Sequence, residues 1–211
     1  MTSTTPTEFP RLILGSTSPY RRELLQRLGI PFDVQAPQVD ETPQPGESPA
    51  DLAMRLALAK AQAVAAQHRD DIVVIGSDQV ADLAGQALGK PGTHERAVRQ
   101  LTAMRGQTVL FHTAVAVVRA TTGFSQTVMS TVRVHMGHYS DADIDTYLRC
   151  EQPYDCAGSA KSEGLGIVLL DRIESDDPTA LIGLPLISTT RMIRQAGLDP
   201  LAWRATHLTK S

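Results

Sequence analysis

The sequence predicts an α/β fold in which a mixed central sheet is flanked by helices. Helices and strands alternate in the first third of the chain, a pattern typical of parallel β–α–β units. Two long apolar segments then follow one another across residues 120–123, which is typical of an antiparallel hairpin. The 211 residues suffice for one domain with a sizeable core.

The first strand and helix carry the most informative stretch of the chain. A strand at 11–14 leads into a hydroxyl-bearing turn, where Ser18 is a suitable helix N-cap and Pro19 fits the first helical position. A helix N-terminus presents unpaired N–H groups and a positive dipole, and here Ser16, Ser18 and Arg21 accompany it. This combination favours an anion, above all phosphate. The alternative is an ordinary β–α connection whose arginines face water.

The later elements follow from capping residues, turn signals and apolar periodicity. A short strand at 32–36 precedes an irregular, proline-rich segment at 37–47, and Ser48 caps a helix that extends to about Gln67. The most apolar strand begins at Asp71, and residues 76–79 stand at its expected carboxyl end, where open α/β sheets bind ligands. The remaining elements are hairpin strands at 80–83 and 86–88, a helix from Thr93 to about Met104, strands at 109–118 and 125–134, a helix from Ser140 to about Cys150, a strand at 164–173 and a helix at 184–196.

Composition limits the organisation and the partners of the chain. No linker or repeat divides it, so we predict a flexible tail at 1–10, a single domain at 11–200 and a C-terminal tail at 201–211. A net charge of −3 argues against nucleic acid and anionic membranes as partners. Cys150 and Cys156 match neither a zinc pair nor a CxxC motif. Reduced thiols and the absence of a signal-like segment predict a cytoplasmic protein.

Carboxylates and cations add a chemical expectation to the anion-binding turn. Glu41 lies in the irregular loop, Asp78 follows the buried strand, Lys60 borders the apolar stripe of its helix, and Lys90 follows a glycine. Carboxylates can hold Mg²⁺ or Mn²⁺ and orient water, while cations neutralise a leaving phosphate. The alternative for each carboxylate is a solvated loop acid. For Asp78 its place after a buried strand favours a function.

Several motifs together resemble a known family. The chain contains Gly-Ser-Thr-Ser-Pro-x-Arg-Arg, Val-Asp-Glu-Thr, Gly-Ser-Asp-Gln-Val, Gly-Lys-Pro and Ala-Gly-Ser-x-Lys-Ser-Glu-Gly in this order, between Arg11 and about Pro200. This set resembles the Maf family of nucleoside triphosphate pyrophosphatases. The resemblance implies a homodimeric α/β protein with two lobes around an active-site cleft, related to inosine triphosphate pyrophosphatases. It also implies hydrolysis between the α and β phosphates with a divalent cation.

The resemblance assigns roles to individual residues of this sequence. Asp78 matches the family's proton acceptor. The positions that handle phosphate and metal match Ser16, Arg21, Glu41, Lys60 and Lys90, with Glu41 and Asp78 as the residues expected to contact the metal.

Three further positions bear on the choice of substrate. Gln79, Tyr20 and Glu163 resemble the group of the family that acts on 7-methyl-GTP. N7-methylation makes guanine cationic, which favours stacking on an aromatic ring, and a carboxylate can accept from guanine's N–H donors. Tyr20 could instead pack on a helix surface, and Glu163 could pair with Lys161. A dTTP/UTP pyrophosphatase of the same family and a nucleotide-binding regulator of cell division or septation remain alternatives.

Other chemistries fit the sequence less well. His135 and His138 are spaced so that they face opposite sides of an extended segment, which argues against zinc. The chain has no Gly-x-Ser-x-Gly motif for a serine hydrolase. Cys156 has no histidine that the sequence places beside it, so we expect a packed thiol.

Overall fold

The computed structural model of the protein describes residues 9–208 and contains one mixed seven-stranded sheet with helices on both faces. The α/β class predicted from the sequence is therefore confirmed. The strands are β1 (Arg11–Gly15), β2 (Asp33–Val34), β3 (Ile72–Leu83), β4 (Gln86–Leu88), β5 (Thr108–Arg119), β6 (Phe124–Met136) and β7 (Leu170–Glu174). The α-helices are α1 (Pro19–Gln26), α2 (Pro49–Ala65), α3 (His94–Met104), α4 (Asp141–Glu151), α5 (Leu186–Gln195) and α6 (Pro200–Leu208).

The strand order is β2-β1-β3-β5-β6-β7, and β4 pairs with β3 outside this path. β1 runs parallel to both β2 and β3, whereas β3, β5, β6 and β7 pair antiparallel in succession. The two pairing modes match the two patterns in the sequence: crossover helices connect the parallel strands, and a short turn at 120–123 connects β5 and β6.

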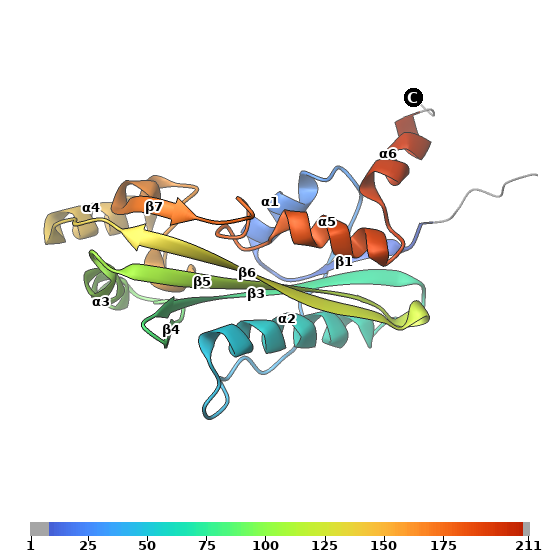
Figure 1. Ribbon diagram of the computed structural model, residues 1–211, viewed down its shortest axis with the longest axis horizontal. Coiled ribbons are helices and arrows are strands. Elements are labelled where there is room, and N and C mark those ends of the chain that lie inside the picture. Colours follow the sequence, from blue (N-terminus) through green and yellow to red (C-terminus); the bar gives the residue numbers. More distant parts are fainter. Residues whose placement is uncertain (1–8, 209–211) are drawn as a thin grey trace, which may run out of the picture.

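Helices cover both faces of the sheet (Figure 1). α2 lies along one face, where its small residues Ala53, Ala57 and Ala61 pack mainly on β3 and β5. α1 and α5 cover the opposite face at one end of the sheet, and α3 and α4 form a separate core around Tyr147 at the other end. Burial of these apolar faces stabilises the arrangement.

The site lies where β1 ends beside β3. β3 is twelve residues long, and one of its edges pairs with β1 over residues 72–76 and with β4 over residues 81–83. Residues 77–80 have a partner strand only on the other side, in β5. Our expectation that 76–79 end the strand was wrong, because pairing with β5 and β4 continues the strand to Leu83. The carboxyl end that borders the site is that of β1.

Other expected boundaries differ for similar reasons. The segment 201–211, predicted to be a tail, is helical as far as Leu208, and Trp203 of this helix packs against the α1–α5 core. The strand expected at 164–173 divides into a 3₁₀ segment, Leu165–Leu169, and β7. The strand expected at 32–36 is only two residues long. Residues 1–8 of the predicted N-terminal tail lie outside the described residues. Between residues 9 and 208, no helix has the length and apolar character needed to cross a membrane.

Candidate active site

A cavity of about 640 Å³ opens beside the free stretch of β3. Segments from the whole length of the chain line it. These are residues 16–21 of the β1–α1 turn, the loop at 37–43, α2, residues 78–80 of β3, residues 87–90, the segment 155–163 and residues 181–183. The ten residues named as site candidates from the sequence all line this cavity: Ser16, Ser18, Tyr20, Arg21, Glu41, Lys60, Asp78, Gln79, Lys90 and Glu163.

The β1–α1 turn forms one end of the cavity. Ser18 caps α1 by accepting a hydrogen bond from Arg21 N, and Ser16 Oγ accepts one from Ser18 N at 3.2 Å. The Arg21 guanidinium donates to Ser16 Oγ at 3.3 Å and to Gly183 O at 2.8 Å. Burial lowers the pKa of Arg21 below its ordinary value, and the charges of Asp78 and Glu41 partly offset this effect. An oriented, desolvated cation beside a helix N-terminus suits a phosphate group.

A buried ammonium joins the two candidate carboxylates. Lys60 Nζ lies 2.6 Å from Asp78 Oδ1 and 2.7 Å from Glu41 Oε1. Only 7% of the Lys60 side chain and 12% of the Asp78 side chain are exposed, whereas 60% of the Glu41 side chain is exposed. The buried Lys60 ammonium thus fixes the orientation of Asp78, and the exposed Glu41 lies on the solvent side of this ammonium.

Gly76 brings these residues together. A Cβ atom at Gly76 would lie 2.3 Å from Ala57 O and 2.5 Å from Ala61 N. Backbone atoms of α2 occupy this space, so only glycine lets the helix approach β3 so closely. Lys60 lies between Ala57 and Ala61 in the sequence, and Asp78 is two residues beyond Gly76. The glycine therefore sets the distance between ammonium and carboxylate.

A second ion pair holds the loop that carries Glu41. Arg55 Nε of α2 lies 2.6 Å from Glu47 Oε1, and the same guanidinium donates to Thr42 O at 3.1 Å. The hydrogen bond from Arg55 lowers the pKa of Glu47 to about 2. Arg55 of α2 thus binds the proline-rich loop at two positions, Thr42 and Glu47, and this keeps Glu41 near Lys60.

Tyr20 of α1 lines the cavity together with Cys156 and Glu163 of the 155–163 segment. The Lys161 ammonium lies 5.3 Å from the centre of the Tyr20 ring and 3.1 Å from Glu151 Oε1. The alternative in which Glu163 pairs with Lys161 was therefore wrong; Glu163 is exposed at the cavity. Burial raises the pKa of Cys156 to about 12, so this thiol is a poor nucleophile at neutral pH.

The remaining candidates differ in how firmly they are held. Lys90 follows β4 and is exposed, with no ion-pair partner within residues 9–208. Gln79 is half-buried and donates hydrogen bonds to the 180–181 backbone. His135 contacts Glu174 and does not lie near His138 in a metal-type arrangement. In the described part of the chain, no three His, Cys, Asp or Glu side chains form a group that could hold a metal without other ligands.

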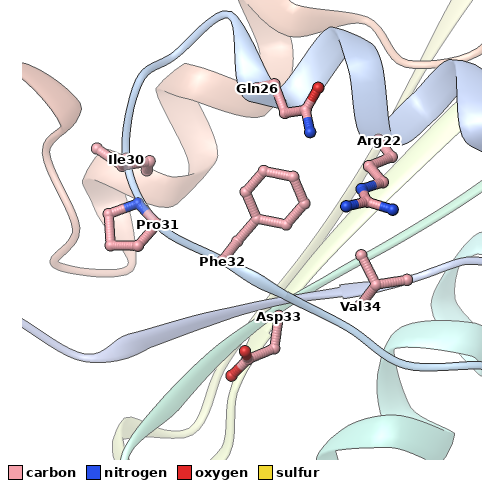
Figure 2. A pocket seen from close by; sticks show the side chains of 7 residues that line it. All are labelled: Arg22, Gln26, Ile30, Pro31, Phe32, Asp33 and Val34. Atoms are coloured by element: carbon pink, nitrogen blue, oxygen red, sulfur yellow. The ribbon is translucent and has the colours of Figure 1, made fainter.

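A second hollow lies on the other side of α1 (Figure 2). Arg22 and Gln26 of α1 and the ring of Phe32 surround it, and its acidic residue, Asp33, is paired with Arg11 at 2.7 Å. The two consecutive arginines therefore face different surroundings. Arg21 lines the large cavity and Arg22 lines this shallower one.

Sequence reasoning missed the residues that hold the walls of the cavity. Ser77 and Thr113 are fully buried and bind the 180–183 backbone, and Arg55 anchors the Glu41 loop. Thr113, together with its neighbour His112, interrupts the apolar run of β5, which was the available signal. Arg55 and Glu47 carried no signal, because a loop and a helix face were both plausible places for exposed charges.

Comparison with known proteins identifies the family. A family model described as "Maf-like protein" matches residues 11–196. The chain belongs to the Maf family.

Relatives cover nearly the whole chain. A protein named 7-methyl-GTP pyrophosphatase from a Polaromonas species is 65% identical over 98% of this chain and 93% of its own length. Proteins of the same name are 65% identical in Albidiferax ferrireducens, over 90% of this chain and 96% of the relative, and 57% identical in Thiobacillus denitrificans, over 98% and 100%. The family resemblance drawn from the motifs is thus confirmed.

Among solved structures, a nucleoside-triphosphatase or dITP/XTP pyrophosphatase from Mycobacterium abscessus is similar, with a TM-score of 0.38 and 18% identity over 61% of this chain and 75% of that one. A HAM1 protein from Coxiella burnetii has a TM-score of 0.39 and 13% identity over 62% and 74%.

Proposed function

We propose that the protein hydrolyses 7-methyl-GTP between its α and β phosphates, giving 7-methyl-GMP and pyrophosphate. The contact between Lys60 and Asp78 at the cavity carries this proposal, because an oriented carboxylate beside an anion-binding turn suits attack of water on a phosphoanhydride. The names of relatives that are 57% to 65% identical support the substrate.

Different residues of the cavity lining have separate tasks in this proposal. Arg21, Ser16 and the N-terminus of α1 bind phosphate oxygens, and Lys90 reaches the leaving pyrophosphate. Asp78 accepts a proton from the attacking water, while Lys60 keeps its carboxylate in place. Because Lys60 donates to Asp78 Oδ1, the other carboxylate oxygen is free to face the water.

The carboxylates also suit a divalent cation. Mg²⁺ is commonly held by one or two carboxylates together with substrate phosphates and water, and the cavity offers Asp78 and Glu41. The scarcity of further ligands fits an ion that arrives with the nucleotide. When bound, such an ion supplies positive charge to the phosphate oxygens. We propose Mg²⁺ or Mn²⁺ in this role.

The base lies beside Tyr20 and Glu163 in this proposal. Tyr20 offers a ring face for a cationic methylguanine, and Glu163 offers an acceptor for guanine N–H groups. Lys161 lies over the Tyr20 ring and does not line the cavity, so it supports the ring from the side away from the cavity.

Pyrophosphate release tests this function. The protein is incubated with Mg²⁺ and 7-methyl-GTP, GTP, dTTP, UTP or ATP, and kcat/KM is measured for each. We expect the highest value for 7-methyl-GTP. Higher activity on dTTP and UTP would favour that group of the family instead, and activity on none of them would reject the enzyme.

The Asp78→Asn variant separates hydrolysis from binding. The amide keeps the shape of the carboxylate but cannot accept the proton, so kcat should fall by about two to four orders of magnitude. Asp176→Asn, an exposed position outside the cavity, is the matched control. A loss below about tenfold would move the proton acceptor elsewhere, with Glu41 next. A homodimer and a cytoplasmic location remain predictions, which light scattering and cell fractionation can check.

A further inference from the structure

One wall of the cavity is the irregular segment 180–183, and side chains from three elements hold it. Arg21 Nε of α1 donates to Gly183 O at 2.8 Å, and Ser77 Oγ of β3 shares its single proton between Gly183 O at 3.1 Å and Ala114 O at 2.8 Å. Gly183 has a φ of 125°, which residues with a side chain rarely adopt. These contacts hold the wall in place without a ligand, and such preorganisation favours selective binding.

The two N–H groups of Gln79 are shared among three acceptors, two carbonyl oxygens of this wall and the hydroxyl of Thr113. Gln79 Nε2 lies 2.9 Å from Leu181 O, 3.1 Å from Ala180 O and 2.9 Å from Thr113 Oγ1. Carbonyl oxygens only accept, so the amide nitrogen must face them. Gln79 Oε1 has no hydrogen-bond partner within the described range, and Gln79 lines the cavity. Toward a ligand, Gln79 therefore acts as an acceptor.

Thr113 completes this arrangement from behind. It lies directly opposite Gln79 in the β3–β5 pair, it is fully buried, and it does not line the cavity. Its hydroxyl donates to Ala180 O at 2.9 Å, and it accepts from Gln79 Nε2. One hydroxyl thus connects the amide of Gln79 to the backbone of the wall.

We propose that Thr113 is a positioning residue for base selection, acting through Gln79 and the 180–181 backbone without touching the nucleotide. The proposal rests on the function proposed above. With Gln79 Oε1 held as an acceptor, guanine, whose Watson–Crick edge presents N–H donors at both N1 and N2, is favoured over adenine, whose N1 is an acceptor and whose only donor on that edge is the N6 amino group.

The test compares Thr113→Val with Thr113→Ser. Valine keeps the shape but removes the hydroxyl, so the ratio of kcat/KM for 7-methyl-GTP to that for ATP should fall by about 3- to 10-fold, the value of one hydrogen bond. Serine retains the hydroxyl and should keep the wild-type ratio. Thr131→Val is the matched control, because its hydroxyl contacts His112 in the neighbouring strand and not the wall. Thermal unfolding of each variant measures stability separately.

A purely structural role predicts that Thr113→Val lowers the melting temperature and reduces activity on both nucleotides equally, which would overturn the proposal. A second outcome would also overturn it. If Thr113→Val lowers the ratio of kcat/KM for GTP to that for dGTP and leaves the ratio for 7-methyl-GTP to ATP unchanged, Gln79 contacts the ribose and not the base. Binding of 7-methyl-GMP and AMP, measured by calorimetry, makes the test independent of hydrolysis. If the wild type hydrolyses nothing but prefers 7-methyl-GMP, and Thr113→Val reduces that preference, the proposed function fails and this inference stands.

Discussion

Replacing Lys60 with Met leaves the Asp78 carboxylate buried without the ammonium that lies 2.6 Å from it. Removing one partner of a buried ion pair costs about 3–5 kcal/mol, because the remaining charge is uncompensated. Asp78 borders the cavity and keeps some access to water, so we expect a smaller loss in unfolding free energy, about 2–3 kcal/mol. For a domain of this size each kcal/mol lowers the melting temperature by about 2–4 °C, which gives a fall of about 4–12 °C.

Thermal unfolding of four proteins measures this effect: wild type, Lys60→Met, Asp78→Asn and the double variant. The double variant should be more stable than Lys60→Met alone, because it removes the buried charge together with its partner. A double variant as unstable as the sum of the two single ones would refute the reasoning.

Two further predictions concern the elements that bring the site together. Gly76→Ala places a Cβ against backbone atoms of α2 at 2.3 and 2.5 Å, so we expect a loss of about 1–3 kcal/mol in unfolding free energy and a kcat below half of wild type, measured by chemical denaturation and pyrophosphate release. Gly85→Ala, whose Cβ would meet nothing within 4 Å but whose φ of 84° disfavours a side chain, shows what backbone strain costs without crowding. Arg55→Gln releases the Glu41 loop and should raise the Mg²⁺ concentration needed for half-maximal activity. Because the pKa of Glu47 is lowered to about 2 from 4.5, the stability that this pair contributes is present above about pH 4.5 and is lost as the pH falls toward 2, so wild type and Arg55→Gln should converge in acid unfolding; a constant difference at all pH values would contradict this assignment.

The sequence alone determined the local structure well, because capping and apolar periodicity are local properties. Ser18, Ser48, Thr93 and Ser140 each cap the helix that was predicted to begin there. The motifs led to the family, and each of the ten site residues that they indicated lines a single cavity. Strand lengths were less accurate, because they depend on partners that lie far apart in the sequence.

Only the tertiary structure decided how those residues meet. The length of β3 follows from its pairing with β5 and β4, so Asp78 lies in the middle of a strand, beside the end of β1. The contact of Lys60 with Asp78 depends on a helix that approaches the sheet at Gly76. Two further contacts join segments that are up to 67 positions apart in the sequence: Lys161 pairs with Glu151, and Thr113 is connected to the 180–181 backbone. Such contacts arise from packing of the whole chain, so no local pattern specifies them.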